Sequence, residues 1–221
     1  MRKFLIPFLV AGLVLAACSD DEKSEETPVE KGLDRLTSDL DDGTLVQTNP
    51  IPGEQFELRM EYSTDYDVKS WRITDSKTLR FAVRLASEVP AETTVLIEHV
   101  HVDVNLDAGK AGIDGLAQDR MDDSLHTGDD PGFYVTAAYP YEEVFSIEGF
   151  SESLISGWGH AVSGTGSSRI EEQRLTEKNL REEGKARGNK FTFIYDVLVR
   201  YSPDEPFHKR VVVDEFIVPI G

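Results

Sequence analysis

The sequence predicts an all-β protein: a two-sheet antiparallel sandwich with a short helical insertion, behind a disordered tether. Three observations carry this prediction. Several segments alternate apolar and polar residues with a period of two, which is typical of half-buried strands. Residues 189–221 hold two β-branched and aromatic runs joined by a proline-rich turn. No repeat of fixed period is present that would indicate a solenoid.

The chain begins with a segment that has the layout of a secretory signal. Arg2 and Lys3 precede an apolar run from Phe4 to Leu15, and two small residues follow it. The run is too short to span a bilayer comfortably, because a spanning helix needs about 20 apolar residues. We therefore expect residues 1–17 to be a cleaved leader.

The single cysteine, Cys18, lies directly after this leader. The sequence Leu15-Ala16-Ala17-Cys18 resembles the lipobox of bacterial lipoproteins. The resemblance implies that Cys18 is diacylated and becomes the first residue of the mature chain. The chain would then face outward from the cytoplasm on a bacterial membrane, the outer membrane in a Gram-negative cell. Two acyl chains provide stable anchoring that one chain does not.

An acid-rich segment separates the cysteine from the predicted domain. Residues 20–42 contain ten acidic and three basic side chains and few apolar ones, a composition that favours a solvated tether. Pro50, Pro52 and Gly53 then interrupt regular structure. The predicted organisation is a tether over residues 18–50 and a β-sandwich over residues 51–221.

The strands are predicted from their alternation. The clearest patterns are Gln55–Tyr62, Thr78–Ala86 and Thr93–Leu106. Less regular patterns predict strands over Ser70–Ile73, Gly132–Tyr139 and Glu142–Phe150, and two more strands flank a turn over Ser202–Pro206.

Two segments predict helical structure. Ser168 and Glu171 have capping-box spacing at the start of a helix that would run to about Glu183. A shorter helical turn is predicted over Leu116–Met121. About eight strands with connections of variable length favour an immunoglobulin-like sandwich, although the Cys-Trp-Cys core of antibody domains is absent.

The charge balance limits the partners. With 41 acidic and 23 basic side chains the formal net charge is −18. Such a chain repels phosphate backbones and anionic headgroups, so we expect no nucleic-acid partner. It favours cationic partners or metal ions.

One strand carries candidate metal ligands. His99, His101 and Asp103 share a face of the Thr93–Leu106 strand, and two imidazoles with a carboxylate suit zinc or copper. A further ligand could come from His126, His160 or His208. The alternative is an ordinary polar, solvent-facing side of a strand.

Acidic loops provide a weaker candidate, for calcium. Their aspartates do not form the alternating D-x-D-x-D-G loop, and solvated turns are the alternative explanation. These residues are Asp107, Asp114, Asp122, Asp123, Asp129 and Asp130.

Trp158 lies in a glycine-rich segment, where an aromatic side chain could contact a partner or could equally belong to the core. No catalytic residue is predicted: the lipid would occupy Cys18, and no G-x-S-x-G elbow is present. The sequence thus favours a non-catalytic binding or envelope-assembly lipoprotein. The alternatives are divalent-metal binding through His99 and His101, and a cell-envelope hydrolase with unidentified acids.

Overall fold

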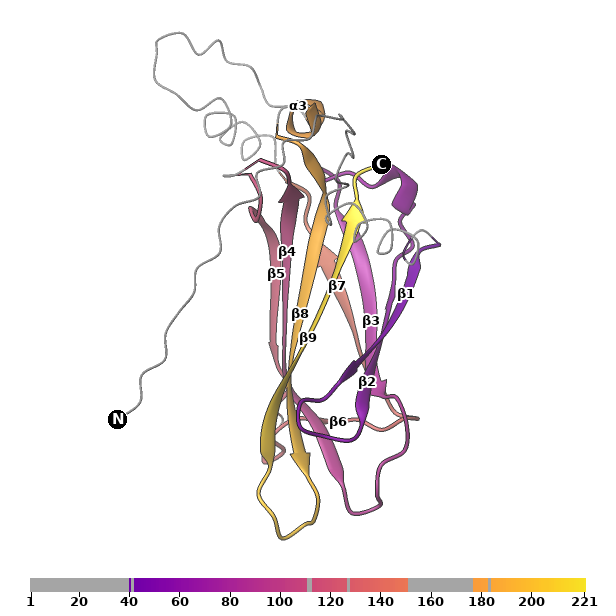
Figure 1. The fold of residues 1–221 in the computed structure, drawn as a ribbon, viewed down its shortest axis with the longest axis vertical. Coiled ribbons are helices and arrows are strands. Elements are labelled where there is room, and N and C mark those ends of the chain that lie inside the picture. The colour runs from indigo at the N-terminus through magenta and orange to yellow at the C-terminus, as the bar shows by residue number, and fades with distance from the viewer. Residues whose placement is uncertain (1–39, 41, 111–112, 127, 151–176, 183) are drawn as a thin grey trace, which may run out of the picture.

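The predicted two-sheet antiparallel sandwich is confirmed (Figure 1). The computed structural model describes residues 40, 42–110, 113–126, 128–150, 177–182 and 184–221. In this part of the chain no helix is long and apolar enough to cross a membrane. The elements in order are β1 (Thr44–Pro50), β2 (Glu57–Ser63), η1 (Val68–Ser70), β3 (Lys77–Leu85), β4 (Thr94–Ala108), β5 (Ala117–Ser124), β6 (Phe133–Tyr134), β7 (Tyr141–Ile147), α3 (Glu177–Glu182), β8 (Ala186–Arg200) and β9 (His208–Pro219).

The first sheet has the strand order β1-β2-β3-β7, and the second has the order β5-β4-β8-β9, with β6 paired to β4. All pairings are antiparallel. β4 and β8 have 15 residues each and form the centre of the second sheet. At about 3.3 Å per residue each spans about 50 Å, so these strands set the length of the molecule.

The molecule has two distinct ends. The described chain enters β1 at the end where Gly221 also lies, which we call the entry end (Figure 1). There the Gly221 amide donates to the Trp71 carbonyl at 3.0 Å. The opposite, distal end holds β6 and the connections that follow β1, β3 and β8. At the distal end the Leu85 amide donates to the Thr136 carbonyl at 3.3 Å.

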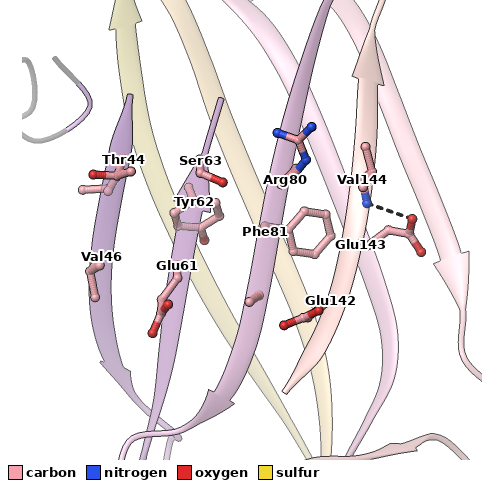
Figure 2. Close-up of a pocket in the computed structure, with 12 residues that line it drawn as sticks. Thr44, Val46, Glu61, Tyr62, Ser63, Arg80, Phe81, Glu142, Glu143 and Val144 are labelled. Atoms are coloured by element: carbon pink, nitrogen blue, oxygen red, sulfur yellow. Dashed lines mark hydrogen bonds between the residues drawn. The ribbon is translucent and has the colours of Figure 1, made fainter. Parts of the chain in front are cut away.

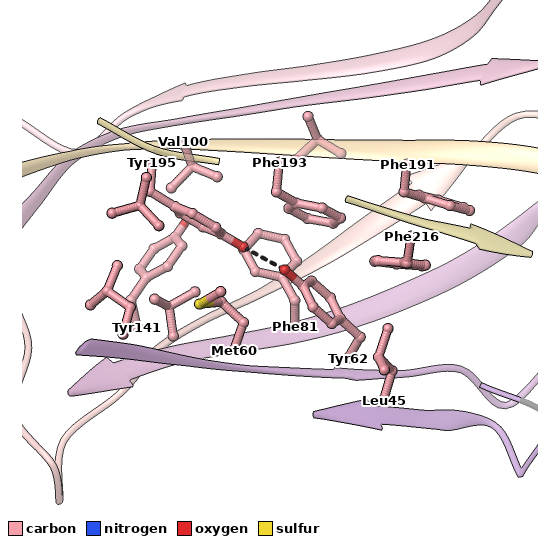
Figure 3. Close-up of a cluster of buried hydrophobic side chains, with 14 of the residues drawn as sticks. Leu45, Met60, Tyr62, Phe81, Val100, Tyr141, Phe191, Phe193, Tyr195 and Phe216 are labelled. Atoms are coloured by element: carbon pink, nitrogen blue, oxygen red, sulfur yellow. Dashed lines mark hydrogen bonds between the residues drawn. The ribbon is translucent and has the colours of Figure 1, made fainter. Parts of the chain in front are cut away.

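The core between the sheets is rich in aromatic side chains (Figure 3). Tyr62 of β2 contacts Phe193 of β8 and Phe216 of β9, with 4.8 Å between ring centroids in both pairs. Phe81 of β3 lies 5.2 Å from Phe193. Because aromatic rings bury large apolar areas and add specific ring contacts, this cluster stabilises the packing of one sheet on the other.

The alternation predicted for β4 is observed. Val100, Val102 and Val104 are completely buried, while His99 and His101 lie on the outer face of the second sheet. The pairing of β4 with β5 and β8 fixes which side chains stand beside these histidines.

The predicted strand over Ser70–Ile73 is wrong. η1 ends at Ser70, and Trp71 and Ile73 follow in irregular backbone although both side chains are completely buried. The Trp71 indole N–H donates to the Asn189 side-chain oxygen at 2.8 Å. The apolar spacing therefore reflects a buried loop that closes the entry end.

The predicted helical turn over Leu116–Met121 is also wrong, because Ala117–Ser124 form β5. This segment pairs with the edge of β4, and the ladder satisfies backbone groups of both strands. The predicted strand over Gly132–Tyr139 is reduced to the two residues of β6. Of the helix predicted from Ser168, the structure describes only the last part, as α3.

The fold begins before the predicted boundary at residue 51. Leu40 and Leu45 are buried, and β1 pairs with β2 along its whole length. After Leu45 the inward positions of β1 hold Gln47 and Asn49, so the strand lacks the apolar alternation that identifies a strand in the sequence.

Side chains connect the edge strands of the two sheets on both sides of the sandwich. On one side, Asn49 of β1 donates to Asp214 of β9 at 2.9 Å and to the Val213 carbonyl at 3.2 Å. On the other side, the Tyr141 hydroxyl of β7 donates to Asp123 of β5 at 3.0 Å. These bridges give hydrogen-bond partners to polar groups of the edge strands of both sheets.

Candidate binding surfaces

Histidine and carboxylate side chains gather on the outer face of the second sheet. Asp122 of β5 lies against both imidazoles of β4: its Oδ1 contacts His99 Nε2, and its Oδ2 lies 3.5 Å from His101 Nδ1. His101 Nε2 also pairs with Asp103 Oδ2 at 2.9 Å. The register explains the arrangement, because His101 and Asp122 are directly paired residues of neighbouring strands.

Basic side chains border this group of residues. Arg120 Nε lies 3.3 Å from Asp103, and Lys209 Nζ lies 2.8 Å from Asp196, whose carboxylate is 3.8 Å from His99 Nδ1. The pKa of Asp122 is lowered, chiefly by its hydrogen bond with His99. The result is an ion-pair network in which every carboxylate has a partner.

The zinc or copper site stays a prediction. Within the described residues no three His, Cys, Asp or Glu side chains are grouped so that they could hold a metal ion. His126 lies 3.3 Å from Glu98, His208 is exposed at the start of β9, and His160 is outside the described residues. The test is a zinc titration of the mature chain, in which a real site would be weakened by His101→Ala.

Among the residues that the structure describes, the candidate calcium ligands form no group of three that could hold a metal ion. Asp107 pairs with Arg187 at 2.8 Å, and Asp114 accepts a hydrogen bond from the Ala108 amide at 3.0 Å. Asp123 is occupied by the Tyr141 bridge across the sandwich edge. Calcium binding therefore also stays a prediction.

Cys18 and Trp158 lie outside the described residues. Lipid attachment at Cys18 and partner contact at Trp158 stay predictions of the sequence.

A groove on the outer face of the first sheet was not predicted (Figure 2). Its volume is about 690 Å³, within the range of small-ligand and peptide sites. Ala82 of β3 lines the groove with a single methyl group, and Val46 and Val144 flank it with exposed fractions of 49% and 51%. Small and half-exposed apolar side chains thus line the hollow.

Fixed charges border the groove. Glu61 pairs with Arg59 at 2.8 Å and contacts Arg84, and these hydrogen bonds lower the pKa of Glu61. Arg80 pairs with Asp65 at 2.6 Å. The groove therefore combines an apolar floor with oriented polar groups, which is the usual composition of a binding site.

The sequence could not reveal this groove, because it depends on pairing between distant segments. Most of its residues are outward positions of β1, β2, β3 and β7, and β7 pairs with β3 although β4, β5 and β6 of the other sheet come between them in the sequence. The sequence shows only that polar residues alternate with core residues along these strands.

No family model matches the chain, and no curated protein matches it. Among solved structures it is similar to a protein from Archaeoglobus fulgidus known from a crystal structure. The two are 9% identical, the match covers 72% of this chain and 94% of that chain, and the TM-score is 0.30. A likeness at this level carries no argument about fold or function.

Proposed function

We propose that this chain is a bacterial lipoprotein, anchored through an acylated Cys18, whose β-sandwich acts as a non-catalytic binding module outside the cytoplasm. The observation that carries the proposal is the position of the only cysteine, directly after the leader and before an acid-rich segment. A thiol at that place serves as an attachment atom, since the chain offers no second cysteine for a disulfide.

The groove supports the binding part of the proposal. It is the concave surface in which half-exposed apolar side chains and oriented charges converge. Burying Val46 and Val144 under a ligand would remove apolar area from water, which favours association. We therefore assign ligand binding to the groove and expect the occupant to be an extended peptide or a small molecule.

Anchoring is tested by labelling cells with radioactive palmitate. The full chain is expected to incorporate label and to sediment with membranes, whereas Cys18→Ala is expected to be unlabelled. An unlabelled wild-type chain would refute the lipoprotein assignment.

Binding is tested by chemical crosslinking on intact cells with a matched pair of variants. Val144→Arg places a charge in the groove, and Val213→Arg places one on the outer face of the second sheet at an equal exposed fraction, 50% against 51%. The groove assignment predicts that only Val144→Arg removes the crosslinked product. Equal products from both variants would contradict it.

A further inference from the structure

The strand register orders the side chains that line the groove on the first sheet. Val46 of β1 pairs with Glu61 of β2, and Glu61 pairs with Ala82 of β3. Ala82 in turn pairs with Glu142 of β7. These four residues form one row across the sheet, which begins with an apolar side chain on β1 and ends with a carboxylate on β7.

Two of the charged side chains that line the groove have ion-pair partners. Glu61 pairs with Arg59 at 2.8 Å and also contacts Arg84. Arg80 pairs with Asp65 at 2.6 Å. The charges of Glu61 and Arg80 are therefore balanced within the sheet.

Glu142 differs from these two residues. Its side chain points from β7 toward β3 across the groove (Figure 2). Within the part of the chain that the structure describes, its carboxylate has no ion pair and no hydrogen bond. The neighbouring Glu143 instead accepts a hydrogen bond from the Val144 amide at 2.8 Å. Glu142 therefore leaves an unneutralised negative charge at the β7 side of the groove.

A cationic side chain matches this charge. The ammonium of lysine or the guanidinium of arginine would pair with Glu142, whereas the net charge of −18 repels anionic ligands. Apolar groups beside the cation would cover Val46 and Ala82 and lose contact with water. The groove thus favours a ligand that combines apolar groups with a positive charge.

The span of the groove fits an extended peptide. Val46 on β1 and Glu142 on β7 are three strand spacings apart, which is about 14 Å at about 4.8 Å per spacing. In an extended peptide, residues i, i+2 and i+4 share one face and cover about 13 Å. One such face can contact Val46, Ala82 and Glu142 together, whereas a small amine reaches only the β7 side.

We propose that the groove binds an extended peptide segment whose lysine or arginine side chain pairs with Glu142 and whose apolar side chains lie over Val46 and Ala82. This inference rests on the assignment of ligand binding to the groove and names the class of ligand. Glu142 is then the residue that determines specificity.

The test is an NMR titration of the mature chain with defined peptides. The capped peptide Val-Ser-Val-Ser-Lys carries two valines and the lysine on one face, and two further peptides replace the lysine by glutamine or glutamate. The lysine peptide is expected to shift the methyl signals of Val46, Ala82 and Val144 but not those of Val213 on the other sheet. Its Kd should be about threefold or more below that of the glutamine peptide, as expected for one exposed ion pair. The glutamate peptide should bind most weakly.

Glu142→Gln is expected to remove the preference for the lysine peptide over the glutamine peptide. Glu57→Gln is the matched control, because Glu57 is an exposed carboxylate of β2 outside the groove. In the described part of the chain the Glu57 carboxylate likewise has no ion pair. The control should retain the preference, and both variants should fold because neither carboxylate has a partner to lose.

Equal affinity for the lysine and glutamine peptides would overturn the proposal, and so would a lysine preference that persists in Glu142→Gln. In both cases the methyl shifts would still locate peptide binding in the groove. Unchanged methyl signals with all three peptides would also overturn the proposal. The crosslinking comparison of Val144→Arg with Val213→Arg then decides separately whether the groove binds another ligand, so the two proposals can fail independently.

Discussion

Lys77, at the start of β3, makes a quantitative prediction possible because its ammonium group is buried. The residue is 4% exposed, and its Nζ donates to the carbonyls of Asp75, at 2.7 Å, and Arg72. The same nitrogen lies 4.7 Å from the ring centroid of Trp71 and 5.5 Å from that of Tyr66. Lys77→Met removes the charge and retains most of the side-chain volume.

The size of the effect follows from the pKa. Burial lowers the pKa of Lys77 from 10.5 to about 8, against the attraction of Asp75 and Glu177. Between these two values the unfolded chain binds more protons than the folded chain, so the contribution of this group to stability rises with pH. The free energy of unfolding of the wild type should gain about 2 to 3 kcal/mol relative to Lys77→Met between pH 7 and pH 10.

Urea denaturation of the mature chain at pH 7, 8, 9 and 10 measures this difference. Tyrosines and carboxylates titrate in both proteins, so the comparison with Lys77→Met largely removes their effects. Lys69→Met is the matched control, because Lys69 is exposed on η1 eight residues earlier. Its difference from the wild type should stay nearly constant over the same range.

Parallel stability curves for the wild type and Lys77→Met would refute the reasoning. They would mean that the Lys77 amino group keeps its proton as readily in the folded chain as in the unfolded one, and so is hydrated.

Three further outcomes are expected. Tyr62→Phe removes the hydroxyl that donates to the buried Asp214 at 2.6 Å. Burial raises the pKa of Asp214, so the loss of unfolding free energy should be about 1 to 3 kcal/mol at pH 7 and smaller at pH 3, where Asp214 is protonated. Equal losses at the two pH values would contradict this. His99→Ala should raise the lowered pKa of Asp122, read from its carboxyl carbon shift during an NMR titration, and an unchanged value would exclude the pairing. Gly132→Ala should lower the urea midpoint, because its Cβ would lie 2.6 Å from a carbonyl oxygen of β4, and a wild-type midpoint would show that the backbone gives way.

Much of the fold could be predicted from local patterns. β2, β3, β4, β8 and β9 were predicted because each has one face in the core and alternates accordingly. β1 and β5 could not be predicted in this way. Gln47 and Asn49 point inward toward the buried Asp214. In β5 the partly buried positions Asp119, Met121 and Asp123 include a single apolar residue, so no apolar alternation is visible.

The candidate sites were predictable only where one strand supplies the residues. The common face of His99 and His101 follows from the period of β4, but the approach of Asp122 depends on the register with β5. The groove depends on pairing between strands far apart in the sequence, which local periodicity does not encode.

The proposed lipid anchor would confine the protein to a membrane surface, and there the bridges between edge strands would have a consequence. Neighbouring copies held in one plane meet far more often than free molecules do. Exposed edge strands of neighbouring copies would then pair with one another and could build fibrils. Asn49 of β1 donates to Asp214 of β9, and Tyr141 of β7 donates to Asp123 of β5. These side chains of the edge strands therefore form hydrogen bonds within their own molecule. These contacts would therefore limit pairing between the edge strands of neighbouring copies.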